Sequence, residues 1–429
     1  GADPIGMEIR AQAFAFASND EVNNMTFYNY VLINRGTQTL YNTYFGFFTD
    51  GALGDPYDDY VGCDVMRGLG YYYNGDNFDG DNSGYKGYGY SPPAVGVDFF
   101  EGPYQDDDGI DNAYGIGLNE ALNGIGYGDG IIDNERFGMR RFLYYSNTTN
   151  GANINQTDPI ASSDYYNYLK GYWKDGTKFV YGGSGHISDP EADPNTPCDF
   201  MFPGTSDFMG WGTGGVIKPN WTEQTANNTP NDRRFVESAG PFVLKPGAVN
   251  NITVGVVWAR SNGGDPFTSV ESLRRADDRA QALFENCFKV MDAPHAPNLE
   301  IQELNNELIL YLSNPINSNN YQEKYEENDP FIVSNNPNVD KTFRFQGYQI
   351  FQLVNNQVAL SDLSNPLKSR LVAQCDIKDN VSRIINFEFD EELGFSVPKE
   401  RVNGENKGIR HSFKVTNDLF AQGQSKLVN

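Results

Sequence analysis

A long acidic segment between residues 50 and 135 places the strongest constraint on how this chain can fold. It holds 18 acidic side chains and only two basic ones, Arg67 and Lys86. Glycine, asparagine and tyrosine separate the acids, in runs such as 55–59 and 106–112. Clustered carboxylates repel one another unless water, a cation or basic groups compensate them. Because basic groups are nearly absent here, the segment is expected either to hold Ca²⁺ or to lie on a solvated acidic face.

The candidate metal ligands are carboxylates of this segment, and structural Ca²⁺ is the cofactor they predict. Calcium takes about six to eight oxygen ligands at about 2.3–2.6 Å, and flexible loops suit it. The spacing does not match an EF-hand, since aligning Gly109 with the loop glycine places Tyr104 at the first ligand position. The prediction therefore rests on composition. The candidate ligands are Asp50, Asp55, Asp58, Asp59, Asp64, Asp76, Asp79, Asp81, Asp106, Asp107, Asp108, Asp111, Asp129, Asp133 and Glu135.

Charge and hydropathy exclude some classes of protein. A pI near 4.4 without a cluster of Lys and Arg argues against nucleic acid and anionic lipid as partners. No apolar run approaches the roughly 20 residues of a membrane span, and no signal peptide opens the chain. Four cysteines, at positions 63, 198, 287 and 375, lie far apart and contain no C-x-x-C, which argues against zinc. Two disulfides and four buried thiols fit their number equally well.

Catalytic motifs give little support for an enzyme. The chain contains no P-loop, GxGxxG or HExxH. The sequence GGSGH at 182–186 resembles a nucleophile elbow, but its fifth position is His186, so the G-x-S-x-G pattern fails. Carboxylate pairs suited to glycosidases could be chosen anywhere among so many acids. The sequence therefore favours a non-enzymatic protein and predicts no catalytic residue.

Tyrosine-rich stretches allow two interpretations. They lie at 71–73, 85–90 and 165–173. Aromatic side chains can form a carbohydrate-stacking surface, or they can pack inside loops that lack aliphatic residues. Packing is the favoured interpretation.

Hydrophobic patterns predict a mainly β fold in two domains. The first, 1–292, is expected to be a β-sandwich with strands near 7–16, 26–33, 43–48 and 137–145 and a hairpin over 235–260. A long ordered acidic loop insertion is predicted at 50–145. One helix is predicted over 269–291, with Thr268 and Glu271 as a capping box.

The second domain is predicted to span 298–429. The break AP-H-AP at 293–297 marks the boundary between the two domains. Alternating segments beyond it indicate a fibronectin III-like or immunoglobulin-like β-sandwich. About six strands are visible where that fold has about seven, so the last strand or strands are expected to be missing.

Several stretches of the chain resemble large secreted proteins of Bacteroidota that end in a type IX secretion sorting domain. The resembling runs are 1–16, 57–64 (YDDYVGCD), 92–100 (PPAVGVDFF), 199–204 (DFMFPG), 238–242 (SAGPF), 246–260, 276–278 with 280–284, and 347–350 (GYQI). They are distributed over most of the chain. The family is mostly uncharacterised, so the resemblance indicates origin and carries over no catalytic residues.

The resemblance implies a longer protein, with the sorting domain beyond residue 429, that is secreted or displayed on the outer face of the outer membrane. The type IX translocon and outer-membrane components would be its partners during export. The function expected from the whole sequence is a non-enzymatic structural or adhesive module stabilised by Ca²⁺. One alternative is an extracellular carbohydrate-binding or hydrolytic protein that contacts surface glycans. Another is a self-associating subunit of a filament or sheath, whose incomplete second domain accepts a neighbour's strand.

Overall fold

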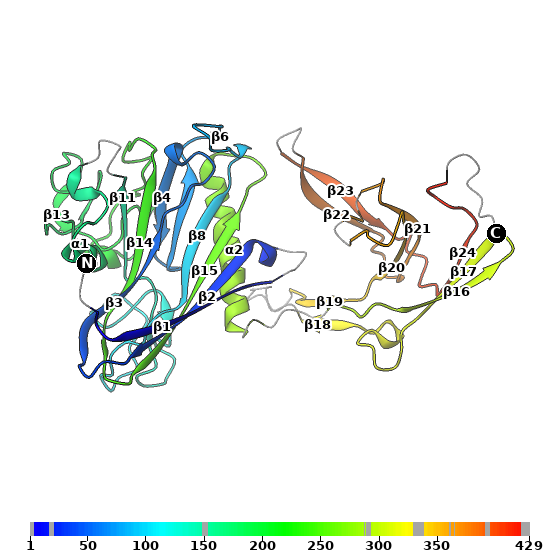
Figure 1. Cartoon of the computed structure of the whole chain (residues 1–429), viewed down its shortest axis with the longest axis horizontal. Coiled ribbons are helices and arrows are strands. Elements are labelled where there is room, and N and C mark those ends of the chain that lie inside the picture. The colour runs from blue at the N-terminus through cyan, green and yellow to red at the C-terminus, as the bar shows by residue number, and fades with distance from the viewer. Residues whose placement is uncertain are drawn as a thin grey trace. The chain divides into compact units, whose positions relative to one another are not determined.

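The computed structural model describes residues 4–16, 21–147, 153–286, 288, 293–328, 339–359, 362–363, 365–390 and 395–421 (Figure 1). The chain divides into two compact units, Gly1–Glu285 and Asn286–Asn429. Antiparallel sheets make up most of the regular structure in both units. The predicted mainly β fold is therefore confirmed.

Two antiparallel sheets form the N-terminal unit. The larger has the strand order β1-β2-β15-β8-β5-β4, and the smaller has the order β11-β14-β3. Their strands are β1 Met7–Ala15, β2 Met25–Asn34, β3 Leu40–Thr49, β4 Asp59–Asp64, β5 Leu69–Asn74, β8 Ala94–Glu101, β11 Arg141–Ser146, β14 Arg233–Leu244 and β15 Val249–Ala259. Short pairs lie outside these sheets: β6 Phe78–Asp79 with β7 Gly89–Tyr90, β9 Gly124–Ile125 with β10 Arg136–Phe137, and β12 Val180–Tyr181 with β13 Asp193–Pro197.

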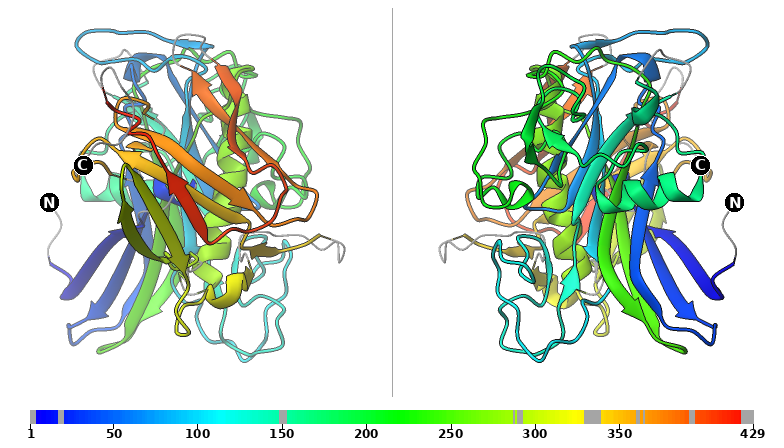
Figure 2. Two further views of the ribbon diagram at one scale, coloured as in Figure 1. Left: turned by 90° about the vertical axis from the view of Figure 1, so that its right-hand side faces the viewer. Right: turned by 90° about the vertical axis from the view of Figure 1, so that its left-hand side faces the viewer.

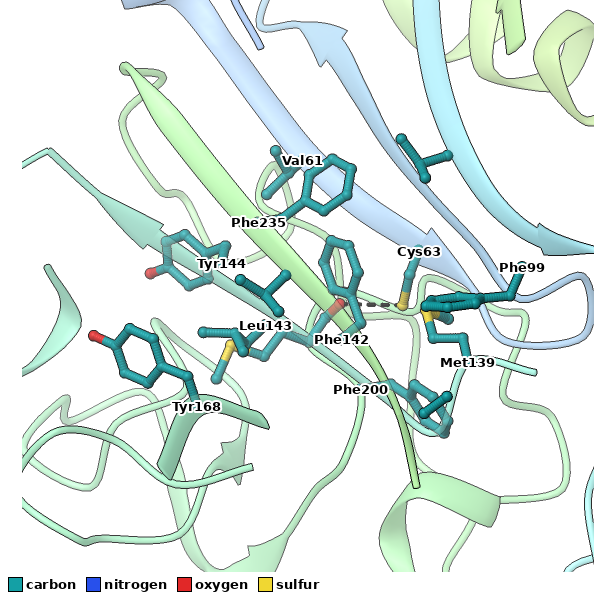
Figure 3. Packing of buried hydrophobic residues seen from close by; sticks show 14 of the residues in the cluster. Val61, Cys63, Phe99, Met139, Phe142, Leu143, Tyr144, Tyr168, Phe200 and Phe235 are labelled. Atoms are coloured by element: carbon teal, nitrogen blue, oxygen red, sulfur yellow. Dashed lines mark hydrogen bonds between the residues drawn. The ribbon is translucent and has the colours of Figure 1, made fainter. Parts of the chain in front are cut away.

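An aromatic core lies between the two sheets (Figure 3). Phe235 of the smaller sheet has its ring centre 4.9 Å from that of Tyr72 and 5.2 Å from that of Phe142. Because side chains alternate along a strand, the neighbours of Tyr72 point the other way, and Tyr71 and Tyr73 contact Phe267 instead. The tyrosine run 71–73 thus packs both faces of the larger sheet.

Helix α2, Pro266–Glu285, covers the outer face of the larger sheet (Figures 1 and 2). It buries Val270, Leu273 and Leu283 along one stripe. The predicted start at 269 is wrong, because Asp265 accepts a hydrogen bond from the Thr268 amide at 3.1 Å and Pro266 occupies the first helical position. The shorter helix α1, Ser162–Lys170, ends at Gly171, whose φ of 81° suits glycine.

The acidic region 50–145 is part of the sheets as well as loop. Strands β4, β5 and β8 occupy adjacent positions in the larger sheet, whereas β11 in the smaller sheet corresponds to the strand predicted near 137–145. The prediction of one long loop insertion is therefore corrected. The strands were missed because β4 and β5 begin or end on polar residues, Asp59 and Asn74, which hides their apolar pattern.

The C-terminal unit consists of small antiparallel sheets around its own core. Strands β16 Asn298–Leu304, β17 Glu307–Ser313 and β24 Ser412–Val415 form one sheet. The pairs are β18 Glu326–Asn328 with β19 Thr342–Arg344, β20 Gly347–Leu353 with β21 Ser369–Asp376, and β22 Arg383–Asp390 with β23 Phe395–Asn403. The core contains Leu310, Leu312, Tyr325, Phe345, Tyr348, Cys375 and Phe413. The missing strand or strands are predicted beyond residue 429, so the incomplete sandwich stays a prediction.

Candidate functional site

A group of oxygen-bearing side chains meets where β4 begins and β5 ends, and we call it the β4–β5 acidic cluster. Asp59 opens β4 directly after a short 3₁₀ turn, Pro56–Asp58, and pairs in register with Asn74, the last residue of β5. Antiparallel pairing thus brings together segments that are 15 residues apart in sequence. The cluster consists of Asp55, Asp58, Asp59, Asn74, Asp76 and Asp79.

The centre of this cluster is buried, and hydrogen-bond donors reach only some of its oxygens. Asp59 and Asn74 are both 0% exposed, and Asp79 is 1% exposed. Asp79 accepts hydrogen bonds from the Asp55 amide at 3.0 Å and from the Tyr88 amide at 2.8 Å. In contrast, one oxygen on each of three side chains has no hydrogen-bond partner among the described residues: Asp58 Oδ1, Asp59 Oδ1 and Asn74 Oδ1. A buried oxygen of this kind is costly unless something else binds it.

The carboxylates of the cluster also repel one another. Burial, and then the charges of Asp79, Asp55 and Asp76, raise the pKa of Asp58 to about 7, although the nearby Asn74 side chain offsets part of the effect. Burial raises the pKa of Asp59 well above its usual range, although the Leu53 amide offsets part of the effect. Within the described residues, no Lys or Arg forms an ion pair with any of these five acids. Basic side chains of the described residues therefore do not compensate this cluster.

The acids between 106 and 135 are arranged differently, in two related loops. The sequences are DGIDN at 108–112 and DGIIDN at 129–134. Asp133 accepts hydrogen bonds from the amides of Asp108 and Gly109 at 2.9 and 2.8 Å. Asp111 accepts from the amides of Gly128 and Gly130 at 2.9 and 2.7 Å. The last aspartate of each loop thus caps the start of the other loop.

The first aspartate of each loop closes its own turn. Asp108 accepts from the Ile110 amide at 3.0 Å, and Asp129 accepts from the Ile131 amide at 2.8 Å. Backbone donors therefore already satisfy these carboxylates. Two further candidates accept hydrogen bonds from backbone amides: Asp106 from Val243 and Glu135 from Asn112. Three others form ion pairs: Asp50 with Arg234, Asp64 with Arg67 and Arg274, and Asp81 with Lys86. Asp107 is exposed to solvent. The structure separates a cluster that lacks counter-charges from acids that hold loops together.

His186 lies in a local turn. It is 4% exposed, its Nε2 is 3.0 Å from Asp175 Oδ2, and its Nδ1 is 2.7 Å from Ser188 Oγ. The Ser188 amide also donates to Nδ1, at 3.1 Å. Because Ser188 binds the ring through both its backbone and its side chain two residues away, the arrangement is a loop-stabilising turn over Trp173.

An aromatic groove of about 480 Å³ lies against α1 and the smaller sheet. Tyr145 and Tyr168 are buried within it, whereas Phe48 and Tyr165 are 53% and 57% exposed. The rings of Phe48 and Tyr145 are nearly parallel, at an angle of 19°. Asp158 supplies a polar group at the groove. Tyrosines 71–73 pack in the fold, but part of the third tyrosine-rich stretch faces this open groove.

Sequence reasoning missed four polar residues that the fold buries. They are Asn74, which ends a strand, and Asp98, Glu237 and Asp277, which are at most 2% exposed. One signal was available, since a lone acid interrupts an apolar run at 94–100, at 235–239 and on the apolar face of α2. Acids at such core-facing positions are rare unless paired.

Comparison with known proteins finds no matching protein family, no matching curated protein and no matching solved structure. Within the part of the chain that the structure describes, no helix is long and apolar enough to cross a membrane. In that same part, no group of three or more His, Cys, Asp or Glu side chains is placed so that it could hold a metal ion. The three cysteines described, Cys63, Cys198 and Cys375, are free and buried, and Cys287 lies outside the described residues.

Proposed function

We propose that this chain is a non-enzymatic structural or adhesive module of a secreted or cell-surface protein, stabilised by Ca²⁺ at the β4–β5 acidic cluster. The observation that carries the proposal is the set of three buried, unpartnered oxygens on Asp58, Asp59 and Asn74. The resemblance to exported proteins of Bacteroidota supports an extracellular location and type IX export, where weak structural Ca²⁺ sites are common.

A hard divalent cation fits the chemistry of this cluster. Asp and Asn oxygens are typical Ca²⁺ ligands, and Ca²⁺ tolerates irregular geometry on loops better than Mg²⁺ does. Asp55, Asp76 and Asp79 lie close enough to raise the pKa of Asp58. A cation would replace their mutual repulsion with attraction, and it would fix the start of β4 to the end of β5.

Calcium is expected to raise the melting temperature of the N-terminal unit, and Asp59→Asn should remove most of that rise. At free Ca²⁺ of about one hundred times Kd, binding stabilises by about 2.7 kcal/mol. In EDTA, Asp59→Asn should be at least as stable as the wild type, because a neutral amide replaces a buried carboxyl group whose ionisation is unfavourable. Calorimetry with and without Ca²⁺ measures both effects.

The matched control is Asp107→Asn, which changes an exposed acid of the same segment. It should keep the full response to Ca²⁺. Limited proteolysis adds a second readout, since EDTA should expose 50–135 to cleavage. Calcium binding would be contradicted if EDTA changed neither the melting temperature nor the cleavage pattern.

Carbohydrate binding is the second candidate function, and the aromatic groove is the observation that favours it. Its volume of about 480 Å³ is within the range of small-molecule sites. Exposed rings at Phe48 and Tyr165 can stack on sugar faces. Asp158 lines the groove, so a carboxylate is available to accept hydrogen bonds from sugar hydroxyl groups.

Replacing Phe48 and Tyr165 together with alanine is expected to weaken any glycan binding at least tenfold, which is about 1.4 kcal/mol. Both side chains are more than half exposed, so the melting temperature should change little. Tyr41→Ala, on the same strand as Phe48 and 71% exposed, is the control. A glycan array followed by titration gives the measurement, and chromogenic substrates separate binding from hydrolysis. Absence of glycan binding by the wild type would remove this candidate.

The filament alternative stays a prediction. Strand β16 is an edge strand of its sheet and is exposed along its whole length. Its apolar residues Leu299, Ile301 and Leu304 are 47–55% exposed. Such an edge is suited to strand addition by a second chain.

A further inference from the structure

A second group of buried acids lies between helix α2 and the larger sheet. Asp98 of β8 and Asp277 of α2 are 1% and 2% exposed, and both line a cavity of about 280 Å³. The β4–β5 acidic cluster shares no residue with this cavity. Neither Asp98 nor Asp277 was expected from the sequence to be a metal ligand.

Three oxygens near the cavity have no donor. Asp98 Oδ1, Asp277 Oδ1 and Asn123 Oδ1 are buried and unpartnered among the described residues. The orientation of Asn123 is fixed, because its Nδ2 donates to the Val65 carbonyl at 2.7 Å and to the Met139 carbonyl at 3.0 Å. Asn123 therefore presents an oxygen, and all three groups are acceptors for a ligand.

The neighbouring cations are engaged with other acids. Arg67 binds both oxygens of Asp278, at 2.8 and 3.0 Å, and Asp64 at 3.1 Å. Arg274 lies 2.9 Å from Asp64 and 2.9 Å from Glu271. Arg67 lines the same cavity, and none of its printed hydrogen bonds goes to Asp98 or Asp277. The ion pairs of both arginines are therefore formed with acids other than Asp98 and Asp277.

We propose that this cavity is a second, independent site for a divalent cation such as Ca²⁺, with Asp98, Asp277 and Asn123 as oxygen ligands. Two carboxylates and one amide oxygen are hard ligands, and water fills the remaining positions of such a site. A water molecule occupies about 30 Å³, so the cavity has room for several. The bound cation would fasten α2 to β8. This site stands whether or not the β4–β5 acidic cluster binds Ca²⁺.

Binding stoichiometry tests the proposal. The full chain is freed of metal with EDTA and titrated with Ca²⁺ by calorimetry. The wild type should bind one equivalent more than Asp277→Asn and one more than Asp98→Asn. Glu271→Gln, an exposed acid on the same helix, should keep the wild-type number. Asp59→Asn should independently lower the number of bound Ca²⁺ ions by one. If it does not, only the proposed site at the β4–β5 acidic cluster is contradicted.

Two results would overturn this second site. The first is that Asp98→Asn and Asp277→Asn bind as many Ca²⁺ ions as the wild type and gain the same melting temperature in Ca²⁺ as in EDTA. That result would mean that the Asp98–Asp277 pair holds a proton in place of a cation. The second uses the wild type and so does not depend on whether a variant folds. Crystals soaked in Tb³⁺ should show an anomalous peak between Asp98 and Asp277, and an empty cavity beside an occupied β4–β5 acidic cluster would refute the proposal.

Discussion

Replacement of Arg233 by methionine is expected to destabilise the N-terminal unit by about 3–5 kcal/mol, because it leaves Glu223 buried as an unpaired charge. Arg233 and Glu223 are 6% and 0% exposed. The guanidinium donates to Glu223 Oε2 at 2.8 Å, and Glu223 Oε1 accepts the Val61 amide at 3.0 Å. This large effect arises without any change at the proposed cation sites.

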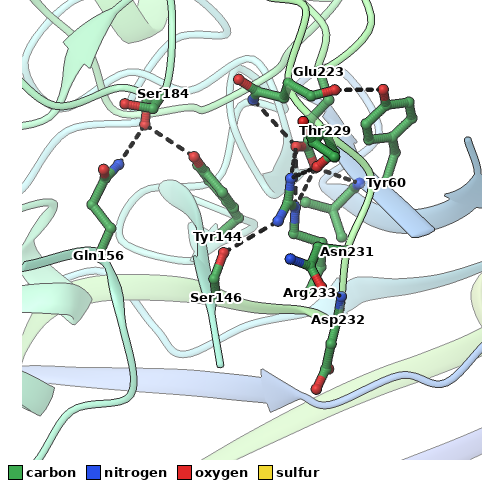
Figure 4. A network of polar contacts seen from close by, with 12 residues as sticks. Tyr60, Tyr144, Ser146, Gln156, Ser184, Glu223, Thr229, Asn231, Asp232 and Arg233 are labelled. Atoms are coloured by element: carbon green, nitrogen blue, oxygen red, sulfur yellow. Dashed lines mark hydrogen bonds and ion pairs between the residues drawn. The ribbon is translucent and has the colours of Figure 1, made fainter. Parts of the chain in front are cut away.

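The ion pair also joins several segments of the unit, as Figure 4 shows. Arg233 donates to the Thr229 carbonyl at 2.7 Å and to Ser146 Oγ on β11 at 3.2 Å. Glu223 accepts from Asn228 as well. Loss of the arginine therefore removes a contact that holds the loop before β14. It also leaves the buried Glu223 carboxylate without its counter-charge.

Chemical denaturation of the N-terminal unit measures the cost. Removing both partners, in Glu223→Leu with Arg233→Met, should cost less than removing Arg233 alone, because no charge is then left unpaired. The control is Lys86→Met, which breaks a surface pair with Asp81 and should cost about 0–1 kcal/mol. A loss below that level in Arg233→Met would show that the buried pair contributes little.

Glu237→Gln is expected to stabilise the protein at pH 8 and to leave it nearly unchanged at pH 4. Glu237 is 0% exposed on β14, and neither of its oxygens has a well-formed hydrogen bond among the described residues. Glycine at position 70 leaves the space for it, since a Cβ there would lie 2.1 Å from Glu237 Oε1. Burial raises the pKa of Glu237 well above its usual range, the Gly70 amide offsets part of this, and Asp277 adds to it.

The direction of the pH dependence follows from that shift. A carboxyl group with a raised pKa in the folded state favours folding while the unfolded chain's group is still protonated, below about pH 4.3. That contribution is lost as the pH rises toward the folded-state pKa. Each unit of difference between the folded-state and unfolded-state pKa changes the free energy of unfolding by about 1.4 kcal/mol. The amide of Gln does not ionise, so Glu237→Gln does not lose this stability as the pH rises.

Melting temperatures from pH 4 to pH 9, compared between wild type and Glu237→Gln, give the test. The difference between the two should grow steadily toward alkaline pH. Glu271→Gln changes an exposed acid and should follow the wild-type profile. A variant that is less stable than the wild type at pH 8 would mean that the Glu237 carboxylate is ionised and stabilised in the fold.

The class of fold was predictable from the sequence because apolar patterns are local. Strand β2 and the stripe on α2 are read directly from their residues. Strands β4 and β5 were not, because Asp59 and Asn74 stand at their ends and tyrosines fill 71–73. Their place in the sheet depends on the pairing of β5 with β8, which lies 20 or more residues away, while β4 pairs with β5.

The candidate site was predictable only as a composition. The sequence identifies the acids of 50–135, but their partners are distant in the chain, as Arg274 is from Asp64 and Asp133 is from Asp108. These contacts decide which carboxylates are compensated. What remains is Asp58 and Asp59 beside Asn74, a residue that a search for acids alone passes over.

Cation binding at the β4–β5 acidic cluster is tested most directly by the electron density of crystals grown with Ca²⁺. We expect a peak about 2.3–2.6 Å from the free oxygens of Asp58, Asp59 and Asn74, with at least three further oxygen ligands. Density with no peak at this position, and with water or protein donors against Asp59 Oδ1, would contradict a calcium-stabilised module.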